Sequence, residues 1–336
     1  MSRIASVATI RFSFFFTKSQ RKPSYMRFTP HYNATKSLAP KVTLHNPSIS
    51  LHNPSNSHTR PPSFQSETIE SQVNSMSARS RNNVKVLGSG ERTLMFAHGY
   101  GCDQSMWKHV APSFPDYRIV LFDYVGSGDS DASAFDQTRY STLHGYATDV
   151  LEIIDELGFE RVNFVGHSVS SMIGALAAIE SPTRFESLTM IGPSPCYIND
   201  GEYIGGFERS DIEGLLESLE CNHVAWSAAM APVIMGKEND PQLSGELEAS
   251  FCRMDPFLAH HFARVTFLSD NRADLPNVST RTLILQCQED AISGPKVGEY
   301  VHACLPNSQL VLINATGHCP HMSAPRQVIE AMKAFL

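Results

Sequence analysis

The chain has 336 residues, of which 42% are hydrophobic and 18% are charged. No apolar run approaches the roughly 20 residues of a membrane-spanning helix, so we expect no membrane partner. Residues 1–66 carry nine Lys and Arg and no Asp or Glu, which leaves 18 basic and 34 acidic groups for residues 67–336. This acidic remainder argues against nucleic acid as a partner.

Residues 1–80 differ in composition from the rest of the chain. They are rich in Ser, Thr, Asn and Pro and show no helical or strand period, so we predict a disordered leader. Residues 1–28 lack acids and carry an apolar patch at 10–16, which is similar to an organellar transit peptide and would place the protein in mitochondria or plastids. Alternatively, translation begins at Met76, residues 1–75 are not part of the protein, and it is cytoplasmic. Both interpretations stay open.

The sequence then alternates between short apolar runs and helical periods. Buried strands are expected at 93–97, 118–122, 161–165 and 187–191, and helices at 105–114, 143–157 and 170–179. Such alternation implies an α/β fold with a mostly parallel, doubly wound sheet that helices cover on both faces.

The alternation stops between about 195 and 262. Helices alone are expected there, at 210–220, 223–235, 242–253 and 256–265, which predicts an inserted helical cap. Strands return at 281–285 and 309–313, with helices at 296–304 and from Arg326 onward. We therefore expect one domain over 81–336, with a core of 81–194 and 263–336 and a cap at about 195–262.

The tripeptide Gly166-His167-Ser168 lies between an expected strand and an expected helix. A serine on such a turn exposes its hydroxyl at the sheet edge, beside the N–H groups of the helix start. The hydroxyl needs a base, and the base needs an orienting acid. His318 and Asp290 follow two later strands and supply both in the order Ser…Asp…His. Glu289 competes with Asp290, and we interpret it as a solvated loop carboxylate.

A tetrahedral intermediate also needs two hydrogen-bond donors for its oxyanion. The N–H of Val169, directly after the nucleophile, is one candidate. The N–H of Tyr100, in the loop that begins at His98 after an earlier strand, is the other. We also expect His98 to contact substrate. The glycine-containing loop at 123–130 lacks the rest of a dinucleotide fingerprint, so we expect no nucleotide cofactor.

Seven cysteines are scattered without a Cys-x-x-Cys pair. An odd count without framework spacing predicts reduced thiols rather than a disulfide scaffold. Cys287 and Cys319 lie near the expected catalytic residues, and we interpret both as apolar packing residues. His321 is likewise interpreted as a packing or loop residue, and we assign no metal ligand.

Residues 81–336 resemble the α/β-hydrolase group that contains a bacterial regulatory hydrolase of the stress sigma factor (RsbQ) and the plant karrikin and strigolactone receptors. Six strings of this chain carry the resemblance: 98–104, 122–128, 165–169, 191–197, 284–287 and 317–323. The resemblance implies the α/β-hydrolase fold, a four-helix cap over a mostly apolar pocket, no cofactor, and a triad of Ser168, Asp290 and His318. It also matches Trp226 to a cap tryptophan, which lines the pocket or packs within the cap; both interpretations stay open. Ser170 replaces a glycine of the bacterial pattern, and Tyr100 replaces a phenylalanine.

Two functions are compatible with these residues. The first is a serine hydrolase that cleaves a small hydrophobic ester, lactone or enol ether through an acyl-enzyme. The second is a receptor-type switch, in which binding or slow hydrolysis of a small hydrophobic ligand recruits a protein signalling partner. A C–C bond hydrolase or a peracid-forming enzyme on the same scaffold is a weaker third interpretation.

Overall fold

The computed structural model describes residues 77–336. The expected disorder and the transit peptide of the leader fall on residues 1–76 and lie outside the described residues. Within residues 77–336, no helix has both the length and the apolar character needed to cross a membrane.

A seven-stranded sheet runs through the described part in the order β1-β3-β2-β4-β5-β6-β7. Its neighbouring strands are parallel, except that β1 and β3 are antiparallel. This arrangement confirms the predicted α/β class with a mostly parallel sheet. The strands span Lys85–Leu87 (β1), Thr93–Ala97 (β2), Arg118–Leu121 (β3), Val162–His167 (β4), Phe185–Ile191 (β5), Thr282–Glu289 (β6) and Ser308–Thr316 (β7).

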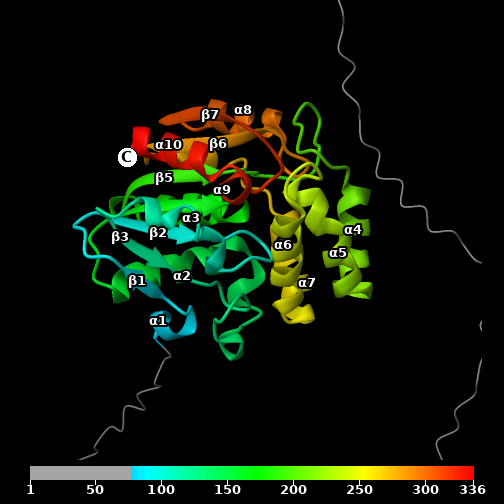
Figure 1. Cartoon of the computed structure of the whole chain (residues 1–336), viewed down its shortest axis with the longest axis horizontal. Coiled ribbons are helices and arrows are strands. Elements are labelled where there is room, and N and C mark those ends of the chain that lie inside the picture. The colour runs from blue at the N-terminus through cyan, green and yellow to red at the C-terminus, as the bar shows by residue number, and fades with distance from the viewer. Residues whose placement is uncertain (1–76) are drawn as a thin grey trace, which may run out of the picture. The chain divides into compact units, whose positions relative to one another are not determined.

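Helices cover both faces of this sheet (Figure 1). The α-helices of the described residues are α1 (Ala78–Arg81), α2 (Leu143–Glu156), α3 (Val169–Glu180), α4 (Arg209–Cys221), α5 (His223–Met235), α6 (Pro241–Arg253), α7 (Pro256–Phe267), α8 (Pro295–Cys304), α9 (Pro320–Ser323) and α10 (Pro325–Phe335). Short 3-10 turns are η1 (Gln104–Trp107), η2 (Ala111–Ser113), η3 (Ala132–Ala134), η4 (Arg139–Ser141), η5 (Pro182–Arg184) and η6 (Leu275–Asn277).

The apolar core consists of two layers, one on each face of the sheet. Successive strand residues point to opposite faces. Met95 and Ala97 of β2 therefore pack with α2, α3 and α8, whereas Leu94 and Phe96 pack in the layer that contains α10 and the cap residues. The doubly wound expectation holds because helices close both layers.

Helices α4 to α7 form the inserted cap between β5 and β6 and stand together at one side of the sheet (Figure 1). Their bounds agree within two residues with the four helices expected from the sequence. Local signals explain this agreement. Asn222, Asp240 and Asp255 cap the N-termini of α5, α6 and α7 with side-chain oxygens, and Pro241 and Pro256 occupy first helical positions.

The start of the folded part differs from the sequence-based expectation. Helix α1 begins at Ala78, and Ser77 caps it by accepting a hydrogen bond from the N–H of Ser80. Residues 77–80 therefore belong to the folded part and not to the expected leader. The single helix expected at 105–114 occurs as the two turns η1 and η2, because Pro112 lacks an N–H and cannot continue a longer helix.

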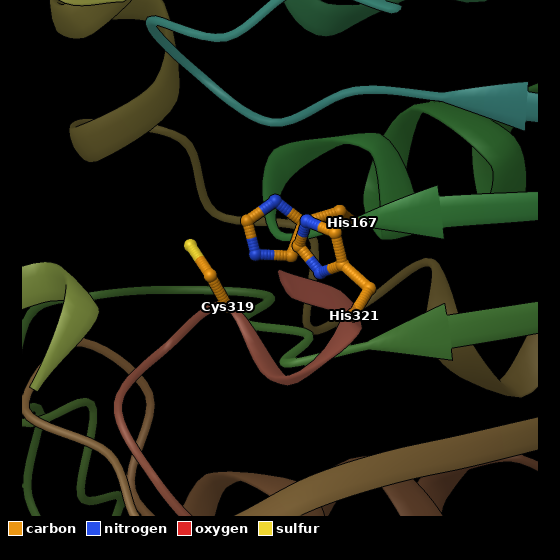
Figure 2. A group of neighbouring side chains, drawn as sticks. All are labelled: His167, Cys319 and His321. Carbon is orange, nitrogen blue, oxygen red and sulfur yellow. The ribbon is translucent and has the colours of Figure 1, made fainter. Parts of the chain in front are cut away.

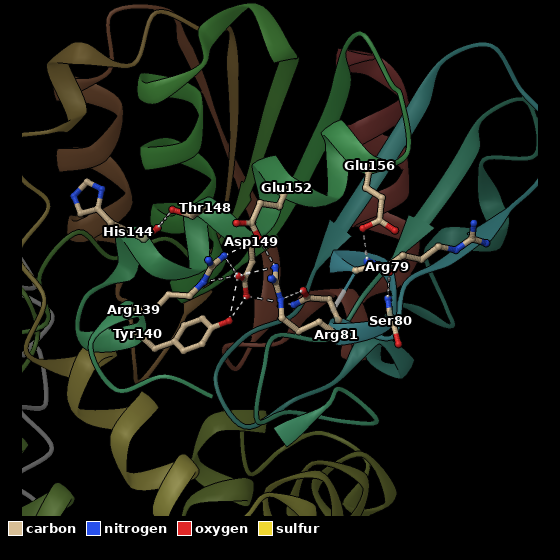
Figure 3. A network of polar contacts seen from close by, with 12 residues as sticks. Arg79, Ser80, Arg81, Arg139, Tyr140, His144, Thr148, Asp149, Glu152 and Glu156 are labelled. Atoms are coloured by element: carbon tan, nitrogen blue, oxygen red, sulfur yellow. Dashed lines mark hydrogen bonds and ion pairs between the residues drawn. The ribbon is translucent and has the colours of Figure 1, made fainter. Parts of the chain in front are cut away.

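A buried polar network attaches α1 to the core (Figure 3). Asp149 of α2 is 0% exposed, and its carboxylate accepts hydrogen bonds from Arg81 at 3.0 Å and from Arg139 at 2.5 Å. The hydroxyl of Tyr140 donates to the same carboxylate at 2.9 Å. Both guanidinium groups also contact Glu152. The charge of the buried carboxylate is thereby compensated on several sides.

Candidate active site

Ser168 occupies a strained turn between β4 and α3. Its φ of 55° and ψ of −121° lie in a region that a residue with a side chain rarely adopts. The turn is sharp enough that a Cβ at Gly166 would come within 2.5 Å of the carbonyl oxygen of Ser170. A strained turn between a strand and a helix is the conformation that the sequence predicted for an elbow at Ser168.

Ser168, His318 and Asp290 form a continuous hydrogen-bonded chain. The Nε2 of His318 lies 2.8 Å from the Ser168 Oγ, and its Nδ1 lies 2.7 Å from the Oδ2 of Asp290. The Oδ1 of Asp290 accepts hydrogen bonds from the N–H groups of Ile292 and Ser293 at 2.8 and 3.0 Å. All three side chains are buried. The carboxylate is thus fixed by backbone donors and in turn orients the imidazole.

Two hydrogen bonds of the His318 backbone hold the loop that carries this residue. The N–H of His318 donates to the carbonyl of Ile234 in the cap at 2.7 Å, and the carbonyl of His318 lies 2.9 Å from the Nε2 of His167. Glu289, the competing acid, is exposed and accepts a hydrogen bond from Thr316. The structure therefore places Asp290, and not Glu289, against the histidine.

The loop after β2 runs directly beside the nucleophile. A Cβ on Gly99 would stand 3.4 Å from the Cβ of Ser168. Among the described residues, neither the Tyr100 N–H nor the Val169 N–H has a hydrogen-bond acceptor. Two free N–H groups beside the serine hydroxyl can stabilise the negative oxygen of a tetrahedral intermediate.

Ser170 fastens this loop to the elbow. Its hydroxyl hydrogen-bonds the carbonyl oxygen of His98 and lies 3.0 Å from the hydroxyl of Tyr124. Because a carbonyl can only accept, Ser170 donates to His98 and accepts from Tyr124. The residue at which this chain departs from the bacterial pattern thus has a local role, which the sequence did not reveal.

His98 does not have the surroundings expected of a substrate contact. It is fully buried, its Nδ1 donates to the carbonyl of Gly99 at 2.8 Å, and its Nε2 accepts the N–H of Tyr124 at 3.1 Å. Both ring nitrogens are therefore occupied within the protein. The contacts give His98 a role in shaping the loop.

Aromatic residues pack around Tyr100, which follows Gly99 in the loop beside the nucleophile. The ring of Tyr100 lies about equally far from four rings, with centroid distances of 5.8–6.1 Å; these belong to Trp226, Phe251, Phe262 and Phe267. Burial raises the pKa of Tyr100, so its hydroxyl stays a neutral donor. Trp226 packs on Phe251 within the cap and also faces Tyr100, so the structure is compatible with both of its expected roles.

Two further residues at the site were not singled out from the sequence. Tyr197 is buried, and burial raises its pKa to about 12 while contact with Ser168 opposes the rise. Its hydroxyl has no hydrogen bond of acceptable geometry to a described residue. Phe251 of α6 lies so close to Gly101 that a Cβ on this glycine would come within 1.9 Å of the ring. Neither contact has a local sequence signal.

Known proteins are similar to this chain in sequence and in fold. Residues 94–331 match the model of the Alpha/beta hydrolase family. The chain is 41% identical over 253 residues to the karrikin insensitive 2 receptor CA of Petunia hybrida, covering 75% of this chain and 94% of that protein. It is 38% identical to the strigolactone esterase D14 of Arabidopsis thaliana, covering 76% and 96%. A solved hydrolase from Oleispira antarctica superposes with a TM-score of 0.75 at 44% identity, covering 77% of this chain and 95% of that one.

Proposed function

Because the chain belongs to the alpha/beta hydrolase family and is a hydrolase of the carboxylic-ester type, we propose that it cleaves a small hydrophobic ester, lactone or enol ether with Ser168 as the nucleophile. His318 takes the hydroxyl proton as Ser168 attacks the carbonyl carbon, and returns it to the leaving oxygen. Water then attacks the acyl-enzyme with His318 as the base, which releases the acid and restores the serine.

The unbroken chain from Asp290 through His318 to Ser168, with distances of 2.7 and 2.8 Å, carries this proposal. The N–H groups of Tyr100 and Val169 are assigned to the oxyanion of the tetrahedral intermediate. Both donors are backbone groups, so the presence of Tyr100 where the family pattern has phenylalanine does not remove either of them.

The substrate class follows from the walls of the site. The rings around Tyr100 offer apolar surface, which suits a ligand of low polarity. The hydroxyl of Tyr197 is a polar group beside Ser168 without a protein partner, so it can hydrogen-bond an oxygen of a bound ester or lactone.

Hydrolysis of p-nitrophenyl acetate by the full chain tests the proposal. Ser168→Ala should lower kcat at least about a thousandfold, because removal of a triad nucleophile costs on that order. Ser210→Ala, an exposed serine of α4, is the matched control and should keep the original rate. A fluorophosphonate probe should add its mass to the original protein and not to Ser168→Ala. Equal rates and equal labelling in both proteins would overturn the assignment.

A receptor-type switch is the second candidate, and we propose it for two reasons. The relatives include proteins named karrikin insensitive 2 receptors. The packing of Phe251 on Gly101 ties cap helix α6 to the loop beside Ser168, so occupancy of the site and the position of α6 depend on each other. A protein partner captured only in the presence of ligand supports the switch. Rapid multiple turnover without a partner supports the enzyme.

A further inference from the structure

Three side chains that the proposed reaction does not use meet behind the triad: His167, Cys319 and His321 (Figure 2). Their ligand-type atoms all lie within 4.8 Å of one another. The three residues are 2%, 1% and 0% exposed. In Figure 2 the two imidazole rings lie against each other, and the sulfur lies to one side of them.

Three of the four imidazole nitrogens of this cluster lack a hydrogen-bond partner among the described residues. The Nε2 of His167 donates to the carbonyl of His318 at 2.9 Å, so its Nδ1 carries a lone pair, and this atom has no hydrogen-bond partner among the described residues. Both ring nitrogens of His321 are also without partners there. Buried nitrogens are usually hydrogen-bonded, so unpartnered ones in a single cluster call for an explanation.

The residue next to one of these unpartnered nitrogens is a glycine. Gly99 stands beside the Nδ1 of His167, where a Cβ would come within 2.4 Å. A side chain at this position would block that nitrogen, and glycine leaves it open.

We propose that His167, Cys319 and His321 form a binding site for one Zn²⁺ ion. Two imidazoles and a thiolate are the ligand types that zinc prefers. Zinc–ligand bonds are about 2.0–2.3 Å long, so the widest separation in the cluster must shorten by roughly 1 Å on binding. Cys319 loses its thiol proton to solvent when the Zn–S bond forms, and no atom changes oxidation state.

A surface pocket of about 270 Å³ lies next to this site in the chain, although the three side chains of the site do not line it. Met322, next to His321, and Cys102 both line it. The carboxylates of Asp103 and Glu246 also line this pocket, where Arg253 and Lys108 pair with them.

An ion at this site acts on the triad through the backbone. His167 directly precedes Ser168, and Cys319 directly follows His318. When Zn²⁺ draws the three side chains together, it moves both of the loops that set the distance between Ser168 and His318. We therefore expect Zn²⁺ to inhibit hydrolysis, since misplacement by about 1 Å can cost on the order of a hundredfold in rate.

Cobalt titration of the full chain under reducing conditions tests the site directly. Co²⁺ replaces Zn²⁺ and reports sulfur ligation through a thiolate-to-metal charge-transfer band. We expect one equivalent of Co²⁺ to produce this band and one equivalent of Zn²⁺ to abolish it. Cys319→Ala should remove the band and weaken Zn²⁺ binding at least tenfold, because even outer partners of metal ligands contribute about 10- to 100-fold. Cys221→Ser, an exposed cysteine of α4, is the control and should leave the band intact.

His321→Leu, of similar volume, gives a second test, with circular dichroism to show that the fold persists. It should also weaken Zn²⁺ binding at least tenfold. A band that persists in Cys319→Ala, or that disappears in Cys221→Ser, would show that the ion binds elsewhere and overturn the proposal. Ser168→Ala should bind Co²⁺ with the same affinity as the original protein, because Ser168 is not a metal ligand. The test of the metal site therefore does not depend on whether Ser168 is the nucleophile.

Discussion

Two aspartates of this protein are buried to the same degree and are partnered in opposite ways. Asp149 is 0% exposed and faces two guanidinium groups, and the Asp290 side chain is 1% exposed and faces one imidazole and two backbone N–H groups. The guanidinium groups that face Asp149 stay charged, so its carboxylate has a structural role: it holds α1 and η4 to α2. A partner that can gain and lose a proton allows Asp290 to serve a reaction. The chemistry of the partner therefore separates the structural carboxylate from the functional one.

Of the variants that test this comparison, Asp290→Asn is expected to have the largest effect. Asp290→Asn should lower kcat about ten-thousandfold, because an amide holds the imidazole in the wrong tautomer and cannot stabilise its charged form. The melting temperature should change little, since the asparagine oxygen can still accept the backbone hydrogen bonds. Steady-state kinetics and thermal unfolding of the same preparation measure both. A variant with normal kcat would remove Asp290 from the triad.

Asp149→Ala should show the reverse pattern. Removing one partner of a buried ion pair typically costs about 3–5 kcal/mol, and we expect roughly 3 kcal/mol because Glu152 still faces both guanidinium groups. Activity per folded molecule should persist. Denaturant unfolding measures the loss. Asp155→Ala, an exposed ion-pair partner on the same helix, is the control and should cost less than about 1 kcal/mol.

An intermediate effect is expected at Ser170, which is buried but bonded to the loop beside the nucleophile. Ser170→Ala leaves the carbonyl of His98 without its donor, which costs about 1–3 kcal/mol of stability. The substitution should also make the position of the Tyr100 N–H less fixed, which should reduce kcat about tenfold. We expect KM to stay nearly unchanged, since the oxyanion forms only after substrate has bound. Loss of stability without any change in kcat would limit Ser170 to a structural role.

The smallest effect is expected at Ser77, the exposed cap of α1. Ser77→Ala should cost about 0.5 kcal/mol, at the low end for an N-cap, because the helix has four residues and Arg81 anchors it independently. Denaturant unfolding of Ser77→Ala and of Ser77→Asp, which preserves the cap, measures the difference. If Ser77→Ala cost as much as Asp149→Ala, the cap rather than the ion network would anchor α1.

Elements with strong local signals could be predicted from the sequence. The cap helices have capping residues and prolines at their starts, and each expected triad residue follows an apolar run. α1 and β1 span only four and three residues, and their partners lie far away in the sequence: Arg81 meets Asp149, and β1 pairs with β3. Elements this short show no hydrophobic periodicity in the sequence, because contacts with distant residues determine where they form.

At the active site, the sequence predicted residue types better than their contacts. It could not show that both nitrogens of His98 are used within the loop, because that depends on the backbone position of Tyr124. It also treated His321 and Cys319 as packing residues. Their proximity to His167 arises from a loop that returns more than 150 residues later in the chain.

The contact between Phe251 and Gly101 has a thermodynamic consequence. The ring of Phe251 in the cap packs directly on Gly101, a glycine with a φ of 74° where no larger side chain fits, so a shift of α6 changes the surroundings of the loop beside Ser168. If a molecule in the site changes the affinity of a second molecule for α6, the second must change the affinity of the first by the same factor. A ligand that tightens a partner tenfold is itself held tenfold more tightly by that partner, about 1.4 kcal/mol in each direction.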